Sequence, residues 1–367
     1  MNIIDYCKLR GDISFREDPI NYVDCVAFSH LVYIIFDNYF NNKKSATIEE
    51  LYKNLNVFYD SDKDRNTNFS LKNEIELLKE MAISKRFKEL KIHNYLSIYH
   101  KDNAEQFAAM VIDLPSRISV VAYRGTDDSL AGWQEDFQLS YKDVSAQYDA
   151  LKYLNHSSRI FRKYYVVGHS KGGNLALYSA VNCKKHVQRR ITKIVSCDGP
   201  GLRYNSYPVK SYNQIKERFV KIVPEFDIVG LFFDDEKEDK IIVKSSSTIF
   251  GQHSGMTWQV DGNKFENVKK LDDKSERIKR AIKSFLESTP EIERKEFEEK
   301  IFDKMKSVDI ESLNDIQANN ISMLFKFSKA LIDIANETKG TVSIFIKALI
   351  KEFSNTKKML GGSNEEN

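Results

Sequence analysis

The stretch that decides the fold is Tyr164–Leu177, with the sequence YYVVGHSKGGNLAL. It begins as an apolar strand and ends as a run of good helix formers. Between them lies the pattern Gly168-x-Ser170-x-Gly172, which is typical of a nucleophile elbow, where a strand turns sharply into a helix. The apex residue of such a turn has a strained backbone, and the glycines let strand and helix approach closely. The pattern predicts a serine hydroxyl at the carboxyl end of a sheet strand.

An elbow of this kind also creates a site for negative charge. The helix that begins after Ser170 directs the backbone N–H of Lys171 toward a developing oxyanion. We therefore predict Ser170 as a nucleophile and Lys171 as a backbone oxyanion donor. The alternative is an ordinary glycine-rich turn with a solvent-facing serine.

A serine nucleophile needs a base, and the seven histidines of the chain can be sorted by position. In α/β-hydrolases the order along the chain is Ser, then Asp or Glu, then His, so the four histidines before the elbow are out of order. His169 adjoins the serine and must leave the elbow in another direction. His186 would lie roughly 24 Å from the serine on a continuous helix. His253, in the loop-forming stretch FGQHSG, remains as the predicted general base.

The acid that orients the base is expected between Ser170 and His253. Asp227 follows an apolar strand over 219–223 and has apolar neighbours, so it is placed to hold an imidazole. Asp198 also ends a strand and is the alternative, although it can instead organise the Gly-Pro-Gly turn that follows it. The prediction is therefore Ser170, Asp227 and His253.

The coarse pattern of the chain predicts an α/β-hydrolase fold with a mostly parallel central sheet. Strand–helix alternation over 118–225 indicates parallel strands joined by helices, and residues 1–90 form a mostly helical segment. We expect the hydrolase domain to span 1–265, a helical appendage to span 266–360, and a disordered tail to span 361–367.

Composition excludes several other classes of protein. The 367 residues include 41% apolar residues, and the formal net charge is only +3, which gives no electrostatic footprint for nucleic acid. The four cysteines have neither disulfide-framework nor metal-ligand spacing, so no metal and no organic cofactor is expected. Without a secretory signal or an apolar run of about 20 residues, the sequence predicts a cytoplasmic protein in a reducing compartment.

A family resemblance rests on Tyr123-Arg124-Gly125-Thr126, Trp133, Asp136, the elbow, Asp227 within FDIV, and the histidine shortly before Trp258. Over about residues 1–265 the chain resembles the class 3 (fungal-type triacylglycerol) lipases and, more closely, a bacterial lipase-like α/β-hydrolase family. The resemblance implies that the backbone N–H of Thr126 is the other oxyanion donor. It also implies an acyl ester or lipid substrate.

Two amphipathic stretches, 316–334 and 342–353, are expected in the appendage. Packing on the hydrolase body or on each other is one interpretation. The other is a lid or lipid-interface element that makes peripheral membrane contact. The sequence as a whole predicts a serine hydrolase that cleaves acyl esters through an acyl-enzyme. The alternatives are a catalytically silent binding or scaffold protein, and a thioesterase or peptidase on the same triad.

Overall fold

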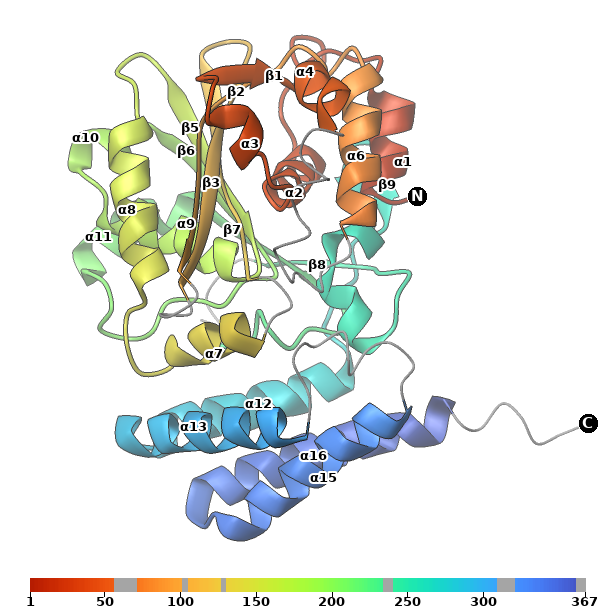
Figure 1. Ribbon diagram of the computed structural model, residues 1–367, viewed down its shortest axis with the longest axis vertical. Helices are drawn as coiled ribbons and strands as arrows, with labels where there is room; N and C mark the ends of the chain where they lie inside the picture. The colour runs from red at the N-terminus through yellow and green to blue at the C-terminus, as the bar shows by residue number, and fades with distance from the viewer. Residues whose placement is uncertain (56–70, 101–104, 127–129, 234–239, 309–320, 361–367) are drawn as a thin grey trace, which may run out of the picture.

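The computed structural model is built around one eight-stranded sheet, whose strands lie in the same order in the sheet as in the sequence (Figure 1). The structure describes residues 1–55, 71–100, 105–126, 130–233, 240–308 and 321–360. The strands are β1 (Ser45–Thr47), β2 (Lys91–His100), β3 (Glu105–Leu114), β4 (Ile118–Tyr123), β5 (Lys163–His169), β6 (Ile191–Cys197), β7 (Phe219–Pro224) and β8 (Lys240–Val243).

The sheet has an antiparallel part and a parallel part. Strands β1 to β4 pair antiparallel, and strands β4 to β8 pair parallel. The parallel strands read as nearly continuous apolar runs because both faces of this part of the sheet are covered; every residue of β7 is buried. The predicted α/β-hydrolase fold with a mostly parallel central sheet is confirmed.

One face of the sheet carries the helices that connect the parallel strands. Parallel strands added in one direction with right-handed crossovers place all their connecting helices on the same side. These helices are α8 (Ser145–Ser157), α9 (Lys171–Asn182), α10 (Lys185–Gln188) and α11 (Val209–Ile215), and Figure 1 shows them together at the left of the sheet. They bury a cluster that includes Val166 and Ile194 of the sheet and Leu175 of α9.

The N-terminal segment covers the opposite face, which the crossovers leave bare. It contains α1 (Ile3–Arg10), α2 (Tyr22–Leu31), α3 (Asp37–Phe40), α4 (Ile48–Lys53) and α6 (Lys72–Ile83), and a hairpin of β9 (Val260–Asp261) and β10 (Lys264–Phe265) adds to this layer. Phe28 and Trp258 belong there to one buried cluster with Val167 and Val195 of the sheet. The mostly helical start of the chain therefore completes the core.

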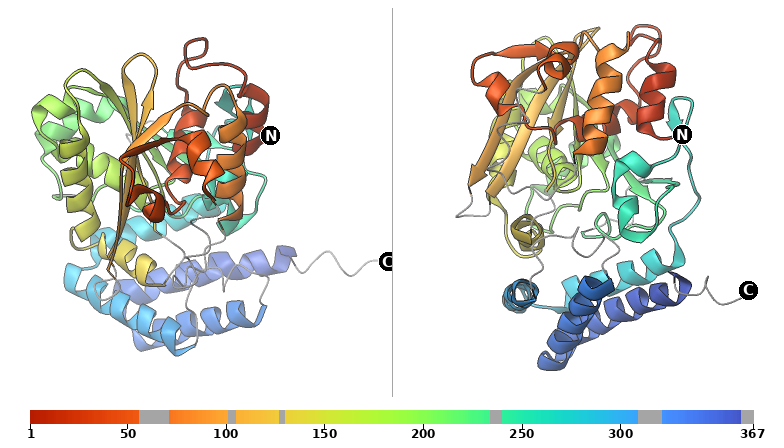
Figure 2. Two further views of the ribbon diagram at one scale, coloured as in Figure 1. Left: turned by 45° about the horizontal axis from the view of Figure 1, so that its top comes forward. Right: turned by 45° about the vertical axis from the view of Figure 1, so that its right-hand side comes forward.

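Four helices near the C-terminus lie across the end of the sheet at which the parallel strands finish (Figures 1 and 2). They are α12 (Asp273–Ser288), α13 (Glu291–Ser307), α15 (Ile321–Glu337) and α16 (Gly340–Leu360). The two amphipathic stretches expected from the sequence overlap α15 and α16. The sequence analysis did not identify α12, although Ile278, Ile282 and Phe285 recur on one helical face and are buried. The tail predicted over 361–367 lies outside the described residues.

The apolar faces of these helices join residues of the hydrolase body in one cluster. Leu331, Ile334, Phe345 and Ile346 are buried together with Val223, which belongs to β7. This arrangement agrees with the interpretation that the appendage packs on the body. The division into domains remains a prediction, because a shared core does not mark a boundary.

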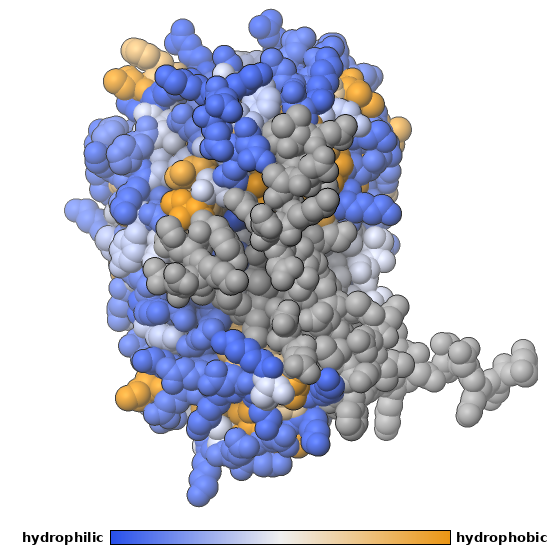
Figure 3. All heavy atoms as spheres, viewed as in Figure 1, coloured by the Kyte–Doolittle hydropathy of each residue, from blue (hydrophilic) through white to orange (hydrophobic). Residues whose placement is uncertain are grey.

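Among the residues coloured in Figure 3, hydrophilic ones predominate on the visible face, and hydrophobic ones form small, separate patches. Within the described parts of the chain, every helix is too short or too polar to cross a lipid bilayer.

Candidate active site

Ser170 lies at the apex between β5 and α9, with φ 57° and ψ −133°. This is a strained conformation for a residue with a side chain, and strain of this kind gathers at functional sites. A Cβ atom placed on Gly168 would lie 2.1 Å from the carbonyl oxygen of Gly172, and one placed on Gly172 would lie 2.3 Å from that of Tyr123. Both positions therefore require glycine, as expected for an elbow.

The elbow adjoins a histidine–carboxylate pair. His253 ends a 3-10 turn over Ile249–His253, and its Nδ1 lies 2.6 Å from Oδ2 of Asp198. Asp198 is 1% exposed and directly follows β6. The N–H of Ser170 donates to the carbonyl of Cys197 at 2.9 Å, so the elbow is tied to the strand end that carries Asp198. These contacts bring the elbow and the pair to one edge of the sheet.

The structure places Asp198, the alternative from the sequence, in the position predicted for Asp227. Asp227 instead accepts a hydrogen bond from the N–H of Gly230 at 2.8 Å. Both carboxylates follow neighbouring parallel strands and thus reach the same edge, which is why the sequence left two candidates. Asp198 follows its strand immediately and has φ 50°. Asp227 lies three residues beyond the end of β7, and its carboxylate binds the N–H of Gly230. The assignment of Asp227 as the partner of His253 is therefore corrected.

The two carboxyl groups are nevertheless neighbours. A Cβ atom on Gly230 would lie 2.8 Å from Oδ1 of Asp198 and 2.7 Å from Oδ2 of Asp227. Burial raises the pKa of Asp198 to about 7, while its side-chain contact with Asp227 and the charge of the buried Lys221 act to lower it. Asp227 thus supports the carboxylate that contacts His253.

Thr126 follows β4 and is held by the next helix, α7 (Leu130–Gln138). Its Oγ1 lies 2.8 Å from both carboxylate oxygens of Asp136. Burial raises the pKa of Asp136 to about 7, although the charge of Lys171 and the hydrogen bond from Thr126 lower it. Residues 127–129, between Thr126 and this helix, lie outside the described residues.

Lys171 is the first residue of α9, so its N–H lies at the helix N-terminus. The side chain is completely buried and runs into the interior. Its ammonium donates to the carbonyl of Gln106 at 3.3 Å and to the carboxylate of Glu135 on α7. The side chains of both predicted oxyanion residues therefore bind carboxylates of α7.

His169 is a neighbour of the site whose role the sequence did not indicate. Its Nε2–H donates to the backbone carbonyl of His253 at 2.7 Å, and its Nδ1 accepts from the hydroxyl of Tyr33 at 2.9 Å. Its ring lies between those of His30 and His253, at centroid distances of 4.6 Å and 4.7 Å. Burial, then the charges of these two histidines, hold the pKa of His169 well below its usual range, so the ring is neutral. No sequence signal links positions 169 and 253.

The appendage contacts two segments of the site. The hydroxyl of Ser275 on α12 accepts a hydrogen bond from the N–H of Asp227 at 2.9 Å. Glu298 on α13 accepts from Gln134 of α7 at 2.6 Å, and from Tyr141. The helices therefore hold both the loop of Asp227 and the helix next to Thr126.

The four cysteines are buried free thiols. In the residues that the structure describes, no group of three or more His, Cys, Asp or Glu side chains is arranged to hold a metal ion.

The chain was also compared with protein families, curated proteins and solved structures. A family model described as Mbeg1-like matches residues 81–303. Among solved structures, "Crystal structure of M37 lipase" aligns with 18% sequence identity and a TM-score of 0.35, over 56% of this chain and 68% of the other. No curated protein matches the sequence.

Proposed function

The chain belongs to the Mbeg1-like family, and we propose that it is a lipase-like serine hydrolase that cleaves acyl esters. The observation that carries this proposal is the strained elbow at Ser170 beside the His253–Asp198 pair at 2.6 Å. A hydroxyl nucleophile, an imidazole base and a buried carboxylate are the three groups that acyl transfer by serine requires. The motifs of the sequence also favour kinship with the class 3 lipases.

In the proposed mechanism, Ser170 Oγ attacks the ester carbonyl while Nε2 of His253 takes the hydroxyl proton. Asp198 accepts from Nδ1–H, which fixes the tautomer and stabilises the imidazolium. The imidazolium then protonates the leaving alcohol, and the acyl group remains on Ser170. A water molecule, deprotonated by the same imidazole, attacks the acyl-enzyme and releases the acid.

We assign stabilisation of the oxyanion to the backbone N–H groups of Thr126 and Lys171. The position of Lys171 at the start of α9 supports this role, because a helix N-terminus favours negative charge. The ion pair of Lys171 with Glu135 and the bonds of Thr126 to Asp136 support it further, since donors fixed in advance need little reorganisation during the reaction.

The proposed substrate is an acyl ester or lipid. Peripheral membrane contact through the C-terminal helices would rest on outward side chains such as Ile332 and Ile344, which are 45% and 68% exposed. The free buried thiols fit the reducing compartment that the sequence predicts.

A fluorophosphonate probe tests the nucleophile directly, because it labels an activated serine covalently. We expect labelling of the wild type and of Ser246→Ala, which alters an exposed serine, and no labelling of Ser170→Ala. Label retained by Ser170→Ala, or absent from the wild type, would refute the assignment. A panel of ester, thioester and peptide substrates then separates the esterase from the thioesterase and peptidase alternatives.

A further inference from the structure

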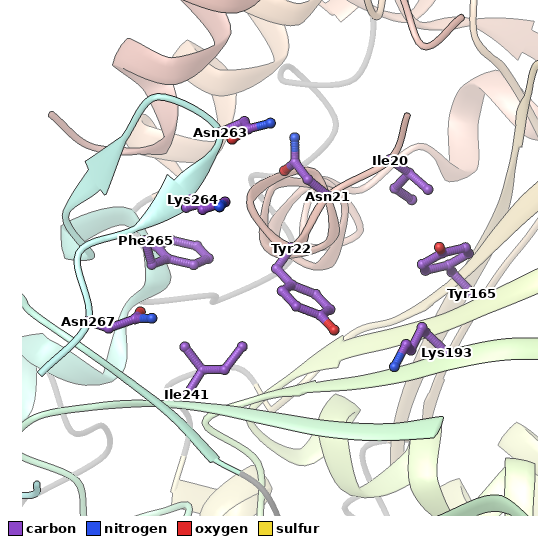
Figure 4. A pocket seen from close by; sticks show the side chains of 10 residues that line it. All are labelled: Ile20, Asn21, Tyr22, Tyr165, Lys193, Ile241, Asn263, Lys264, Phe265 and Asn267. Carbon is purple, nitrogen blue, oxygen red and sulfur yellow. The ribbon is translucent and has the colours of Figure 1, made fainter. Parts of the chain in front are cut away.

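A cavity of about 380 Å³ lies away from the elbow, on the face of the sheet that the N-terminal helices cover. It is bounded by the start of α2, strands β5, β6 and β8, and the β9–β10 hairpin (Figure 4). Tyr165 lines it from β5, five residues before Ser170, which corresponds to about 16 Å along a strand. The cavity therefore lies toward the amino-terminal ends of the strands, and Ser170 lies beyond their carboxyl ends.

The walls of the cavity are aromatic and aliphatic. Tyr22, Tyr165 and Ile241 are half-buried, and Phe265 is buried. In Figure 4 these side chains surround one space, and the amine of Lys193 extends into it from β6. Small-molecule sites combine such an apolar lining with a few polar groups that fix orientation.

Lys193 is an unusual residue for this position. On β6 it alternates with Val195 and Cys197, which belong to the hydrophobic core of this face, so a lysine interrupts an otherwise apolar row. No hydrogen bond or ion pair joins its ammonium to any other group in the described ranges. Lys193 is half-buried as a residue, and a lysine ammonium near an apolar lining gains from an anionic partner.

The other polar groups of the cavity also favour an anionic ligand. The hydroxyls of Tyr22 and Tyr165 have no hydrogen-bond partner among the described residues. Burial raises the pKa of both phenols, so they remain donors at neutral pH. Lys264 adds a second cation at the exposed rim.

No carboxylate lines the cavity within the described parts of the chain. The nearby Asp18, which contacts the lining residue Asn263 at 3.3 Å, is paired with Arg10 at 2.8 Å. The charge balance of the cavity therefore favours an anion.

We propose that this cavity binds a small carboxylic acid with an apolar body, such as a medium-chain fatty acid. The carboxylate lies against Lys193 with Tyr22 and Tyr165 as further donors, and the apolar body lies against Ile241 and Phe265. A cavity of about 380 Å³ is near the low end of the ~300–1,000 Å³ typical of ligand sites, which selects a small ligand. This inference rests on the cavity alone and does not require the proposed hydrolase activity.

Isothermal titration of the full chain with octanoate tests the proposal, with 1-octanol and acetate as probes that lack the charge or the apolar body. We expect octanoate to bind with one-to-one stoichiometry and both other probes to bind at least about tenfold more weakly. Lys193→Met, which keeps the stem and removes the charge, should weaken octanoate binding about tenfold or more, and Tyr22→Phe should weaken it several-fold.

Two matched variants test whether the loss of octanoate binding is specific to this cavity. Lys210→Met removes an exposed lysine from α11 on the other face of the sheet, and Ser170→Ala alters the proposed nucleophile; both should bind octanoate like the wild type. The proposal would be overturned if Lys193→Met bound octanoate as well as the wild type, or if Lys210→Met lost as much affinity as Lys193→Met. It would also be overturned if the wild type did not bind octanoate at millimolar concentration. Loss in Ser170→Ala alone would place octanoate at the elbow and would also overturn it. Failure of the fluorophosphonate test would leave these expectations unchanged.

Discussion

Replacing each of the two neighbouring aspartates by asparagine tests which carboxylate orients the base. The hydrogen bond of Asp198 to Nδ1 of His253 is 2.6 Å long and lies in a site where Asp198 is 1% exposed. An asparagine there can present its amide N–H₂ to Nδ1 and thereby select the wrong imidazole tautomer. We expect Asp198→Asn to lower kcat/KM by about 10⁴-fold, which corresponds to roughly 5.5 kcal/mol of transition-state stabilisation.

Asp227→Asn should have a much smaller effect, because the amide group of asparagine can donate a hydrogen bond to the neighbouring carboxylate of Asp198. We expect a loss of less than about tenfold, and a larger loss in Asp227→Ala, which leaves no polar side chain beside the carboxylate of Asp198. The assay is hydrolysis of a short p-nitrophenyl ester, with thermal melting of each variant to confirm that it is folded. A large loss in folded Asp227→Asn with near-normal turnover in Asp198→Asn would refute the reasoning and restore the assignment made from the sequence.

Four further predictions follow from the same contacts. His169→Phe removes the donor to the carbonyl of His253 and should lower kcat about 10–100-fold with little change in KM. A change in KM with unchanged kcat would contradict a positioning role. Gly168→Ala forces a Cβ to within 2.1 Å of a backbone oxygen and should destabilise the fold by about 3 kcal/mol or more. Gly262→Asn is the control: the site is open and has φ 61°, a conformation that asparagine tolerates better than other residues with side chains, so this variant should lose much less stability. Glu298→Ala breaks the contacts of α13 with Gln134 of α7 and with Tyr141 and should reduce turnover in the esterase assay; unchanged turnover would show that the appendage does not support the site. Because burial raises the pKa of Asp136 from 3.8 to about 7, the folded state holds an extra proton between these values, so stability should fall as pH rises from about 4 to about 7; urea midpoints should show a weaker pH dependence in Asp136→Asn.

Local features of the chain determined much of this protein. The elbow follows from a strand, two glycines and a helix within Tyr164–Leu177, where sterics act between residues close in sequence. Alternation of strands and helices over 118–225 likewise determined a parallel sheet with helical connections. Elimination among the histidines left His253, and the structure pairs that residue with a carboxylate at a strand end.

The tertiary structure decided which groups meet across the sheet edge. Asp198 and Asp227 both follow strands with similar local patterns, and only the path of the loop around His253 selects between them. The bond from His169 to the carbonyl of residue 253 joins positions 84 apart in sequence, and the contact of Ser275 with Asp227 depends on helix α12. Local sequence encodes backbone conformation over short ranges, whereas these contacts depend on the summed placement of many elements in space.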